Sequence, residues 1–120
     1  MLSRPQQHWL EVETVGDVTV ARFTRPRLLE EEAVEAVGKQ LLRLAADTGC
    51  SKFVLNFGKV ESLTTAFFGK LVALHKQVAD SGGRLVLCQV GPFVREIFKI
   101  LELPRPVSVY DAEQEALQSF

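Results

Sequence analysis

The sequence has few of the side chains that build metal or redox sites, and it has no long apolar segment. Its two histidines, His8 and His75, do not lie at a metal-ligand spacing from Cys, Asp or Glu, so we expect no metal site and no cofactor. Its two cysteines, Cys50 and Cys88, cannot form a multi-bridge framework, and we expect reduced thiols, with Cys88 packed in a strand. The longest uncharged apolar run, residues 85–94, is shorter than the ~20 residues that span a bilayer, so no membrane-spanning helix is expected.

An excess of charge of one sign is also lacking. The 120 residues include 14 Lys and Arg against 15 Asp and Glu, which gives a formal net charge of −1 and a pI near 6.1. A nucleic-acid-binding face or a polybasic membrane anchor needs a positive surplus, so neither kind of partner is expected. Residues 1–8 contain no apolar core of a secretory signal. We therefore predict a cytoplasmic protein with a short tail over residues 1–8 and a single domain over residues 9–118.

The motifs of common enzyme classes are absent as well. There is no glycine-rich dinucleotide-binding or phosphate-binding loop, because the pair Gly82–Gly83 precedes a predicted strand, which is the wrong context for either. No serine lies in a Gly-x-Ser-x-Gly turn. His75 falls in the middle of a predicted helix, where it is more typical of a partly exposed residue than of a general base. These absences favour a protein that is not an enzyme.

Hydrophobic periodicity predicts five strands and four helices. Two strands over residues 9–24 are joined by a turn at Gly16–Asp17, and Arg25–Pro26–Arg27 then forms a solvated loop. Helices over residues 29–46, 65–80 and 91–104 alternate with strands over residues 52–57, 84–90 and 107–109. A terminal helix follows Asp111, the predicted N-cap, with Gln114 three residues on. The order ββαβαβαβα predicts an α/β fold with a mixed β-sheet, parallel in its later part, and covering helices.

Each of the first three helices carries an apolar stripe that should face the core. The stripe of the first helix consists of Leu29, Ala33, Val37, Leu41 and Leu44. The second helix has one stripe of Phe67, Leu71, Leu74 and Val78 and another of Phe68, Val72 and Ala79. The inner side of the third is predicted to consist of Phe93, Ile97, Ile100 and Leu101. Because Phe67 and Phe68 point about 100° apart on a helix, either one anchors a partner or both are covered by loops.

A polar segment, residues 60–69, joins a buried strand to the second helix, at the end of a strand where ligand and partner sites collect. Thr64 suits the N-cap, where its hydroxyl would accept a hydrogen bond from a backbone N–H. Thr65 would be the first helical residue. A phosphoryl group on Thr65 would carry about −1.5 to −2 charge onto the positive end of the helix, which could change binding without disrupting the fold. The alternative is that Thr65 only begins the helix.

The chain resembles the STAS domain family, which includes the anti-sigma factor antagonists of bacterial partner-switching systems. The resemblance extends from about Trp9 to Leu117 and is carried by residues 54–71, by residues 81–87 (Ser-Gly-Gly-Arg-Leu-Val-Leu) and by residues 90–98 (Val-Gly-Pro-Phe-Val-Arg-Glu-Ile-Phe). In the family a strand leads to Asp-Ser-Ser/Thr-Gly and then to a helix with a later Gly. On this chain the Asp position is Thr64 and the phosphorylated position is Thr65. The next two are Ala66 and Phe67, and the later Gly is Gly69.

This resemblance implies a STAS-like fold and a role as an interaction module. The implied phosphoacceptor is Thr65, with Thr64 as the alternative. The implied partner is a kinase-type anti-sigma factor, a serine/threonine kinase of histidine-kinase-like fold, together with a phosphatase. The implied partner-binding residues are Lys59, Glu61, Ser62, Thr64, Phe68, Lys70 and Val72.

Two other functions are compatible with the same residues. One is a scaffold that does not depend on phosphorylation, because the family's Asp and Gly are replaced here by Thr64 and Phe67. The other is a sensor of a small molecule or a lipid head group, which would use the helix N-terminus as an anion site. The identity of the partner and the oligomeric state do not follow from the sequence.

Overall fold

The structure is a computed structural model that describes residues 9–47, 51–101 and 107–120. Three sequence predictions, on the tail over residues 1–8, on Cys50 and on a helix end at residues 104–106, lie outside these ranges. The elements are β1 (Leu10–Val15), β2 (Val18–Phe23), β3 (Arg27–Leu28), α1 (Glu31–Asp47), β4 (Lys52–Asn56), β5 (Ser62–Leu63), α2 (Thr65–Asp80), β6 (Arg84–Cys88), α3 (Pro92–Leu101), β7 (Ser108–Tyr110) and α4 (Glu113–Gln118).

The main sheet has five strands in the order β1-β2-β4-β6-β7. Strands β1 and β2 form the predicted antiparallel hairpin, whose turn has Gly16 at a φ of 63°, a conformation that glycine adopts without strain. Strands β2, β4, β6 and β7 are parallel to their neighbours. The mixed α/β sheet predicted from the element order is therefore confirmed.

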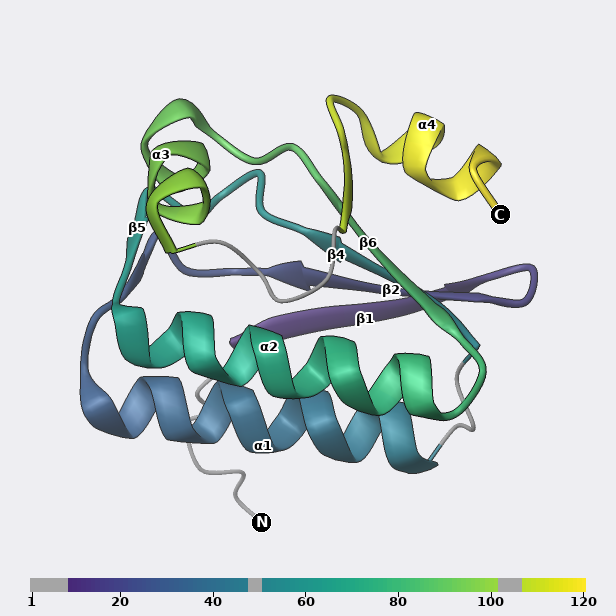
Figure 1. The fold of residues 1–120 in the computed structure, drawn as a ribbon, viewed down its shortest axis with the longest axis horizontal. Coiled ribbons are helices and arrows are strands. Elements are labelled where there is room, and N and C mark those ends of the chain that lie inside the picture. The colour runs from purple at the N-terminus through teal and green to yellow at the C-terminus, as the bar shows by residue number, and fades with distance from the viewer. Residues whose placement is uncertain (1–8, 48–50, 102–106) are drawn as a thin grey trace, which may run out of the picture.

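Helices cover both faces of this sheet (Figure 1), as the alternation of apolar side chains along the strands requires. In β4, Phe53 and Leu55 face the core beneath α1 and α2, which lie side by side. Val54 faces a second, smaller core that Ala116 of α4 completes on the opposite side. Because both faces of the central strands are buried, the nearly continuous apolar runs of β4 and β6 have a direct structural cause.

A second sheet of two short strands was not predicted. Strand β3 pairs with β5 in parallel, with Arg27 opposite Ser62 and Leu28 opposite Leu63. The carbonyl oxygen of Pro26 also accepts hydrogen bonds from the backbone N–H groups of Glu61 (2.7 Å) and Ser62 (3.2 Å). The segment expected to be only a solvated loop therefore holds the chain just before α2 in place, although Arg25 and Arg27 are exposed as predicted.

Two helix starts differ from the prediction. Helix α1 begins at Glu31, so Leu29 precedes it and is 48% exposed instead of facing the core. Helix α4 has Ala112 as its N-cap in place of Asp111, and the carboxylate of Glu115, not Gln114, accepts a hydrogen bond from the Ala112 N–H at 3.1 Å. Asp111 instead pairs with Arg95 at 3.1 Å.

The predicted burial of the first α2 stripe is confirmed, whereas Val72 and Ala79 of the second stripe are half-buried and the prediction for α3 is wrong in part. All four members of the first α2 stripe, Phe67, Leu71, Leu74 and Val78, are buried. On α3 only Val94 is buried, whereas Phe93 is 58% and Ile100 is 78% exposed. Within the described residues, no helix is both long and apolar enough to cross a bilayer.

Candidate functional site at the start of helix α2

A chain of backbone and side-chain hydrogen bonds positions the start of α2. Strand β4 ends at Asn56, whose side-chain oxygen accepts a hydrogen bond from the Gly58 N–H at 2.7 Å. The Val60 N–H then donates to the Phe57 carbonyl at 2.9 Å, which completes a turn. After this turn β5 pairs with β3, and α2 begins two residues later. The loop before α2 is therefore fixed by the sheet.

Thr64 is the N-cap of α2, as predicted. Its backbone is extended, with φ −98° and ψ 165°, and its hydroxyl oxygen accepts a hydrogen bond from the Phe67 N–H at 3.2 Å. Thr65 is the first residue of the helix and is exposed. The first turn contains no acidic residue, so the partial positive charge of the helix N-terminus is not offset there.

Phe67 does not cover the Thr65 hydroxyl. It follows Thr65 by two residues, which places it about 160° away around the helix. The Phe67 side chain is fully buried and packs edge-to-face against Phe23, with the ring centroids 5.6 Å apart. The bulky residue at the family's Gly position therefore fills the core and leaves the surface around Thr65 open.

The other predicted partner-binding residues differ in how far they are exposed to solvent. Lys59 and Glu61 are exposed on the loop before α2, and Ser62 and Val72 are half-buried. Phe68 is 8% exposed and lies against Phe98 of α3, with the ring centroids 5.7 Å apart. With Phe67 also buried, both rings are covered as the alternative expected, but their ring contacts are with Phe23 of β2 and Phe98 of α3 and not with loops.

Lys70 is held by the neighbouring helix. Its ammonium group lies 3.0 Å from the Glu35 carboxylate of α1. Its alkyl chain crosses Gly38, where an added Cβ would lie 2.8 Å from the Lys70 Cδ atom. Lys70 therefore joins α1 to α2 in this structure. This contact could not be predicted from the sequence.

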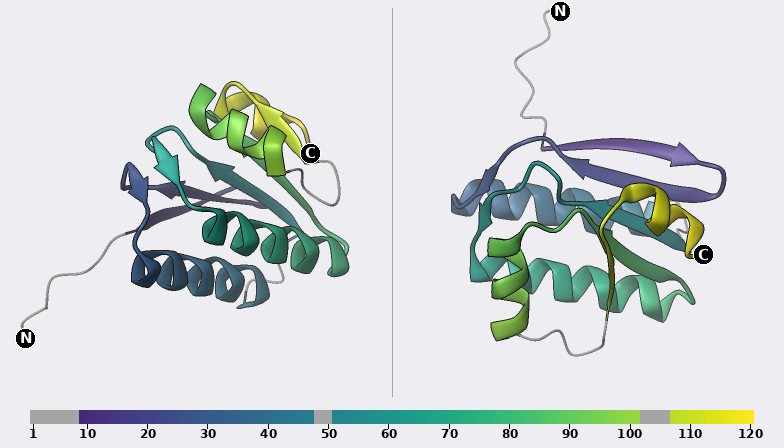
Figure 2. Two further views of the ribbon diagram at one scale, coloured as in Figure 1. Left: turned by 60° about the vertical axis from the view of Figure 1, so that its left-hand side comes forward. Right: turned by 90° about the horizontal axis from the view of Figure 1, so that it is seen from above.

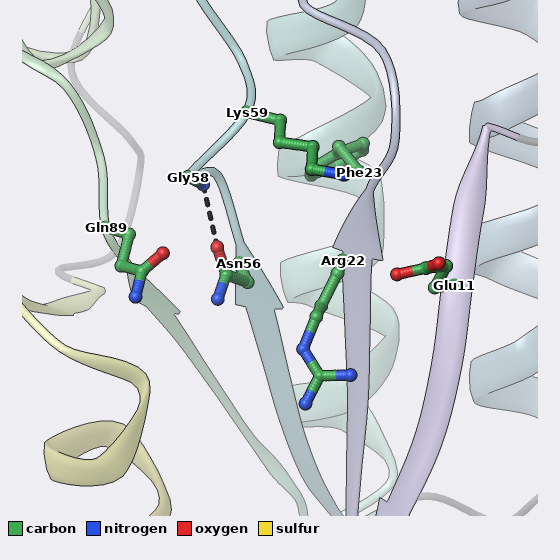
Figure 3. Close-up of a pocket in the computed structure, with 7 residues that line it drawn as sticks. All are labelled: Glu11, Arg22, Phe23, Asn56, Gly58, Lys59 and Gln89. Carbon is green, nitrogen blue, oxygen red and sulfur yellow. Dashed lines mark hydrogen bonds between the residues drawn. The ribbon is translucent and has the colours of Figure 1, made fainter.

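A pocket of about 260 Å³ lies beside the same loop, at the carboxyl ends of β2, β4 and β6. Figure 3 shows its lining residues, which are Glu11, Arg22, Phe23, Asn56, Gly58, Lys59 and Gln89. The Arg22 guanidinium is already paired with Glu113 and Glu13, each at 2.8 Å. Those carboxylates, with that of Glu113 most important, raise the pKa of Arg22 further above its ordinary value. In the described part of the chain no three His, Cys, Asp or Glu side chains converge as metal ligands would.

Sequence reasoning missed Phe93 and Ile100 as surface residues of α3. Six of the ten residues of α3 are apolar, Phe93, Val94, Ile97, Phe98, Ile100 and Leu101, which is more than one buried face of a short helix accommodates. This excess of apolar residues is the feature of the sequence that indicates exposed apolar side chains on α3. The packing of Phe98 against Phe57 and Phe68 decides which of the six turn inward.

Comparison with known proteins identifies the family. A family model described as STAS domain matches residues 10–116. The chain belongs to the STAS domain family. The solved structure of a candidate anti-sigma factor antagonist from Thermotoga maritima superposes on this STAS domain with a TM-score of 0.78 and 25% identity, covering 92% of this chain and 93% of that one. Bacillus SpoIIAA in its phosphorylated form has the same fold, with a TM-score of 0.68 and 22% identity over 91% of this chain and 96% of that one.

Curated relatives match a shorter segment of this STAS domain. BtrV of Bordetella bronchiseptica, a candidate anti-sigma factor antagonist, is 29% identical over 79 residues, which is 66% of this chain and 68% of that protein. A candidate anti-sigma factor antagonist of Thermotoga neapolitana is 33% identical over 70 residues, or 58% of this chain and 62% of that protein. The match thus spans about two thirds of each relative.

Proposed function

We propose that this STAS domain is an anti-sigma factor antagonist, and that phosphorylation of Thr65 controls its binding to an anti-sigma factor. The observation that carries the proposal is the exposed position of Thr65 as the first residue of α2. The names of the relatives support the general role, because they describe candidate anti-sigma factor antagonists. The role needs no catalytic group on this chain and would be exercised in the cytoplasm.

The proposed partner is a kinase-type anti-sigma factor of histidine-kinase-like fold. The Thr65 hydroxyl oxygen would attack the γ-phosphorus of ATP, the bond to the β,γ-bridging oxygen would break, and ADP would leave while the kinase takes the hydroxyl proton. A phosphatase would restore the hydroxyl by hydrolysis. The dephosphorylated chain would bind the anti-sigma factor and so release the sigma factor.

Local electrostatics support a switch that leaves the fold intact. A phosphate at a helix N-terminus interacts favourably with the helix dipole, so α2 would be stabilised rather than unfolded. The same phosphate would add about −1.5 to −2 charge to the surface that Lys59, Glu61 and Ser62 border. A partner that docks there would meet a surface of changed charge, while the core beneath stays the same.

The replacement of the family's Asp by Thr64 fits this proposal, because threonine keeps the capping hydrogen bond. Thr64 stays the weaker alternative phosphoacceptor, since it is half-buried and its oxygen is engaged with the Phe67 N–H. Among the proposed contact residues, Phe68 and Lys70 would act indirectly, by fixing α3 and α1 beside α2.

The test combines phosphorylation mapping with binding. The chain is incubated with the anti-sigma kinases encoded in its source genome and ATP, the modified residue is mapped by mass spectrometry, and affinities are measured for Thr65→Ala and Thr65→Glu. We expect phosphate on Thr65, wild-type affinity for Thr65→Ala, and at least tenfold weaker binding by Thr65→Glu. Thr14→Glu, which adds the same charge at an exposed threonine of β1, is the matched control.

Two results would contradict the proposal in different ways. Binding that is unaffected by ATP and by Thr65→Glu would support a scaffold that does not depend on phosphorylation. No binding of the wild-type chain to any of these kinases would remove the anti-sigma factor antagonist role itself.

A further inference from the structure

Two of the largest exposed apolar side chains of the described residues lie on one shoulder of α3. Phe93 is 58% and Ile100 is 78% exposed, and they are seven residues apart, so they lie on the same side of the helix. Ile97, half-buried, lies between them. We call these three residues the α3 shoulder. An exposed apolar patch of this kind marks an interaction surface more often than scattered single residues do.

The α3 shoulder lies on the side of α3 that is nearer to β5. Arg95 pairs with Asp111, which directly follows β7, so Arg95 marks the side of α3 that faces β7. Phe93 lies about 160° around the helix from Arg95, on the side toward β5. Strand β5 contacts α3, and both views of Figure 2 place α3 between β5 and the β7–α4 segment. The shoulder therefore borders the strand that leads into Thr64 and Thr65.

Three exposed cations lie on the two segments that form the second sheet. Arg25 precedes β3 by two residues, Arg27 is the first residue of β3, and Lys59 lies on the loop before β5. Within the described residues none of them takes part in an ion pair, although Arg25 stacks over the Trp9 ring at 4.8 Å. Three exposed acidic residues lie near these cations: Glu61 is two residues after Lys59, Glu30 is three residues after Arg27, and Glu11 lines the same pocket as Lys59. We call these three cations the basic rim.

We propose that the α3 shoulder is the apolar anchor of the anti-sigma factor interface, and that the partner presents an apolar pocket bordered by acidic residues facing the basic rim. This inference rests on the proposed function and names the chemistry of its partner. Truncation of a central aromatic or large aliphatic side chain has the largest effects on binding at interfaces, whereas rim charges mainly set the rate of encounter. Phosphate on Thr65 would then weaken the electrostatic part of the interface, since it repels acidic residues of the partner and partly neutralises the basic rim.

The anchor is tested with Phe93→Ser and Ile100→Ser, using calorimetry against the anti-sigma factor that binds the wild type. Each variant should bind at least tenfold more weakly. Val12→Ser is the matched control, because Val12 is an exposed apolar residue on β1, at the edge of the sheet, and its variant should bind within twofold of wild type. All three variants should keep the wild-type melting temperature within a few degrees, since each residue is exposed.

The acidic rim of the partner is tested with Arg27→Glu and with salt. Wild-type affinity should fall as NaCl rises from 50 to 300 mM, and Arg27→Glu should slow association at least fivefold at the lower salt while leaving dissociation nearly unchanged. If wild-type affinity does not depend on salt and the association rate of Arg27→Glu is unchanged, the inference that the partner presents acidic residues is overturned.

The outcomes separate this inference from the proposed function. If the wild type binds and both serine variants bind within twofold of it, only the inference is overturned. If the wild type binds no anti-sigma factor, the proposed function falls and the inference falls with it. Self-association of the wild type that Phe93→Ser abolishes would make a second copy of the chain the occupant, which also overturns the inference.

Discussion

Glu113 at the start of α4 accepts two hydrogen bonds from the Arg22 guanidinium on β2, each 2.8 Å long, although 91 residues separate the two along the chain. Asn56 at the end of β4 donates a third hydrogen bond to the same carboxylate, also at 2.8 Å. The side-chain oxygen of Asn56 in turn accepts from the Gly58 N–H in the loop that leads to α2. Glu113 thus ties the terminal helix to the loop before the proposed phosphorylation site.

We predict that Glu113→Gln lowers the free energy of unfolding by about 1–2 kcal/mol at pH 7, because it removes the charge from these hydrogen bonds. Urea unfolding measures the change. Glu13→Gln is the matched control, because Glu13 pairs with the same Arg22 but is 54% exposed, and it should change stability by less than about 0.5 kcal/mol. Equal effects of the two variants would contradict the special role of Glu113.

The pH dependence of stability follows from the same carboxylate. Hydrogen bonds from Arg22, and to a smaller extent from Asn56, hold the pKa of Glu113 below its ordinary value of 4.5 against the effect of burial. Its contribution is therefore complete above pH 4.5 and is lost as pH falls through the lower, folded pKa. We expect wild type to lose stability more steeply than Glu113→Gln between pH 5 and pH 3 in urea unfolding. Parallel curves would show that Glu113 does not titrate differently on folding.

The two threonines at the start of α2 should have different roles: we expect Thr64 to contribute to stability and Thr65 to contribute little. Thr64→Ala removes the capping hydrogen bond to the Phe67 N–H and should lower stability by about 1 kcal/mol. Thr65→Ala removes no such bond and should change it by less than about 0.5 kcal/mol. Thermal unfolding of both variants, with Thr64→Ser as a variant that keeps the cap, measures the difference. A larger loss from Thr65→Ala would mean that its hydroxyl has a structural role.

Two glycines should respond to alanine in opposite directions. Gly69 lies within α2, and a Cβ there would have no atom within 4 Å, so Gly69→Ala should raise stability by about 0.5–1 kcal/mol. A Cβ on Gly83 would lie 2.8 Å from the Cα and the carbonyl oxygen of Ser51, which are backbone atoms, so Gly83→Ala should lower stability by about 1–3 kcal/mol. Chemical denaturation measures whether each substitution raises or lowers the free energy of unfolding. Stabilisation by Gly83→Ala would show that the Ser51 backbone moves aside.

The main layout of the fold could be predicted because its signals are long and repeated. The apolar runs of β4 and β6 and the four-residue stripe of α2 each depend on several residues, so no single contact could reverse them. Strands β3 and β5 have two residues each and exist only because distant segments meet at Pro26, Arg27 and Ser62. No periodicity extends over two residues, so the sequence could not reveal them.

At the start of α4 the structure departs from the better local pattern. Asp111 and Gln114 have the spacing of a capping box, but Asp111 pairs with Arg95, and the N-cap is Ala112, which has no side-chain acceptor and whose N–H donates to the Glu115 carboxylate. At the candidate site, the N-cap role of Thr64 was visible in the sequence, because capping is local. The exposure of Phe93 was not, because it depends on how Phe98 packs against other helices and loops.

Cys88 should be chemically inert in the folded chain. Its side chain is fully buried at the end of β6, and burial, with a smaller effect of the nearby Glu113 carboxylate, raises its pKa to about 12. At pH 8 almost no thiolate is present, and the thiolate is the reactive form. We expect iodoacetamide at pH 8 to leave the tryptic peptide of residues 85–95, which contains Cys88, unmodified in the native chain and fully alkylated in 6 M guanidinium chloride. Alkylation of that peptide at the same rate in both conditions would show that β6 and α4 separate readily, and that Glu113 does not hold α4 against the sheet.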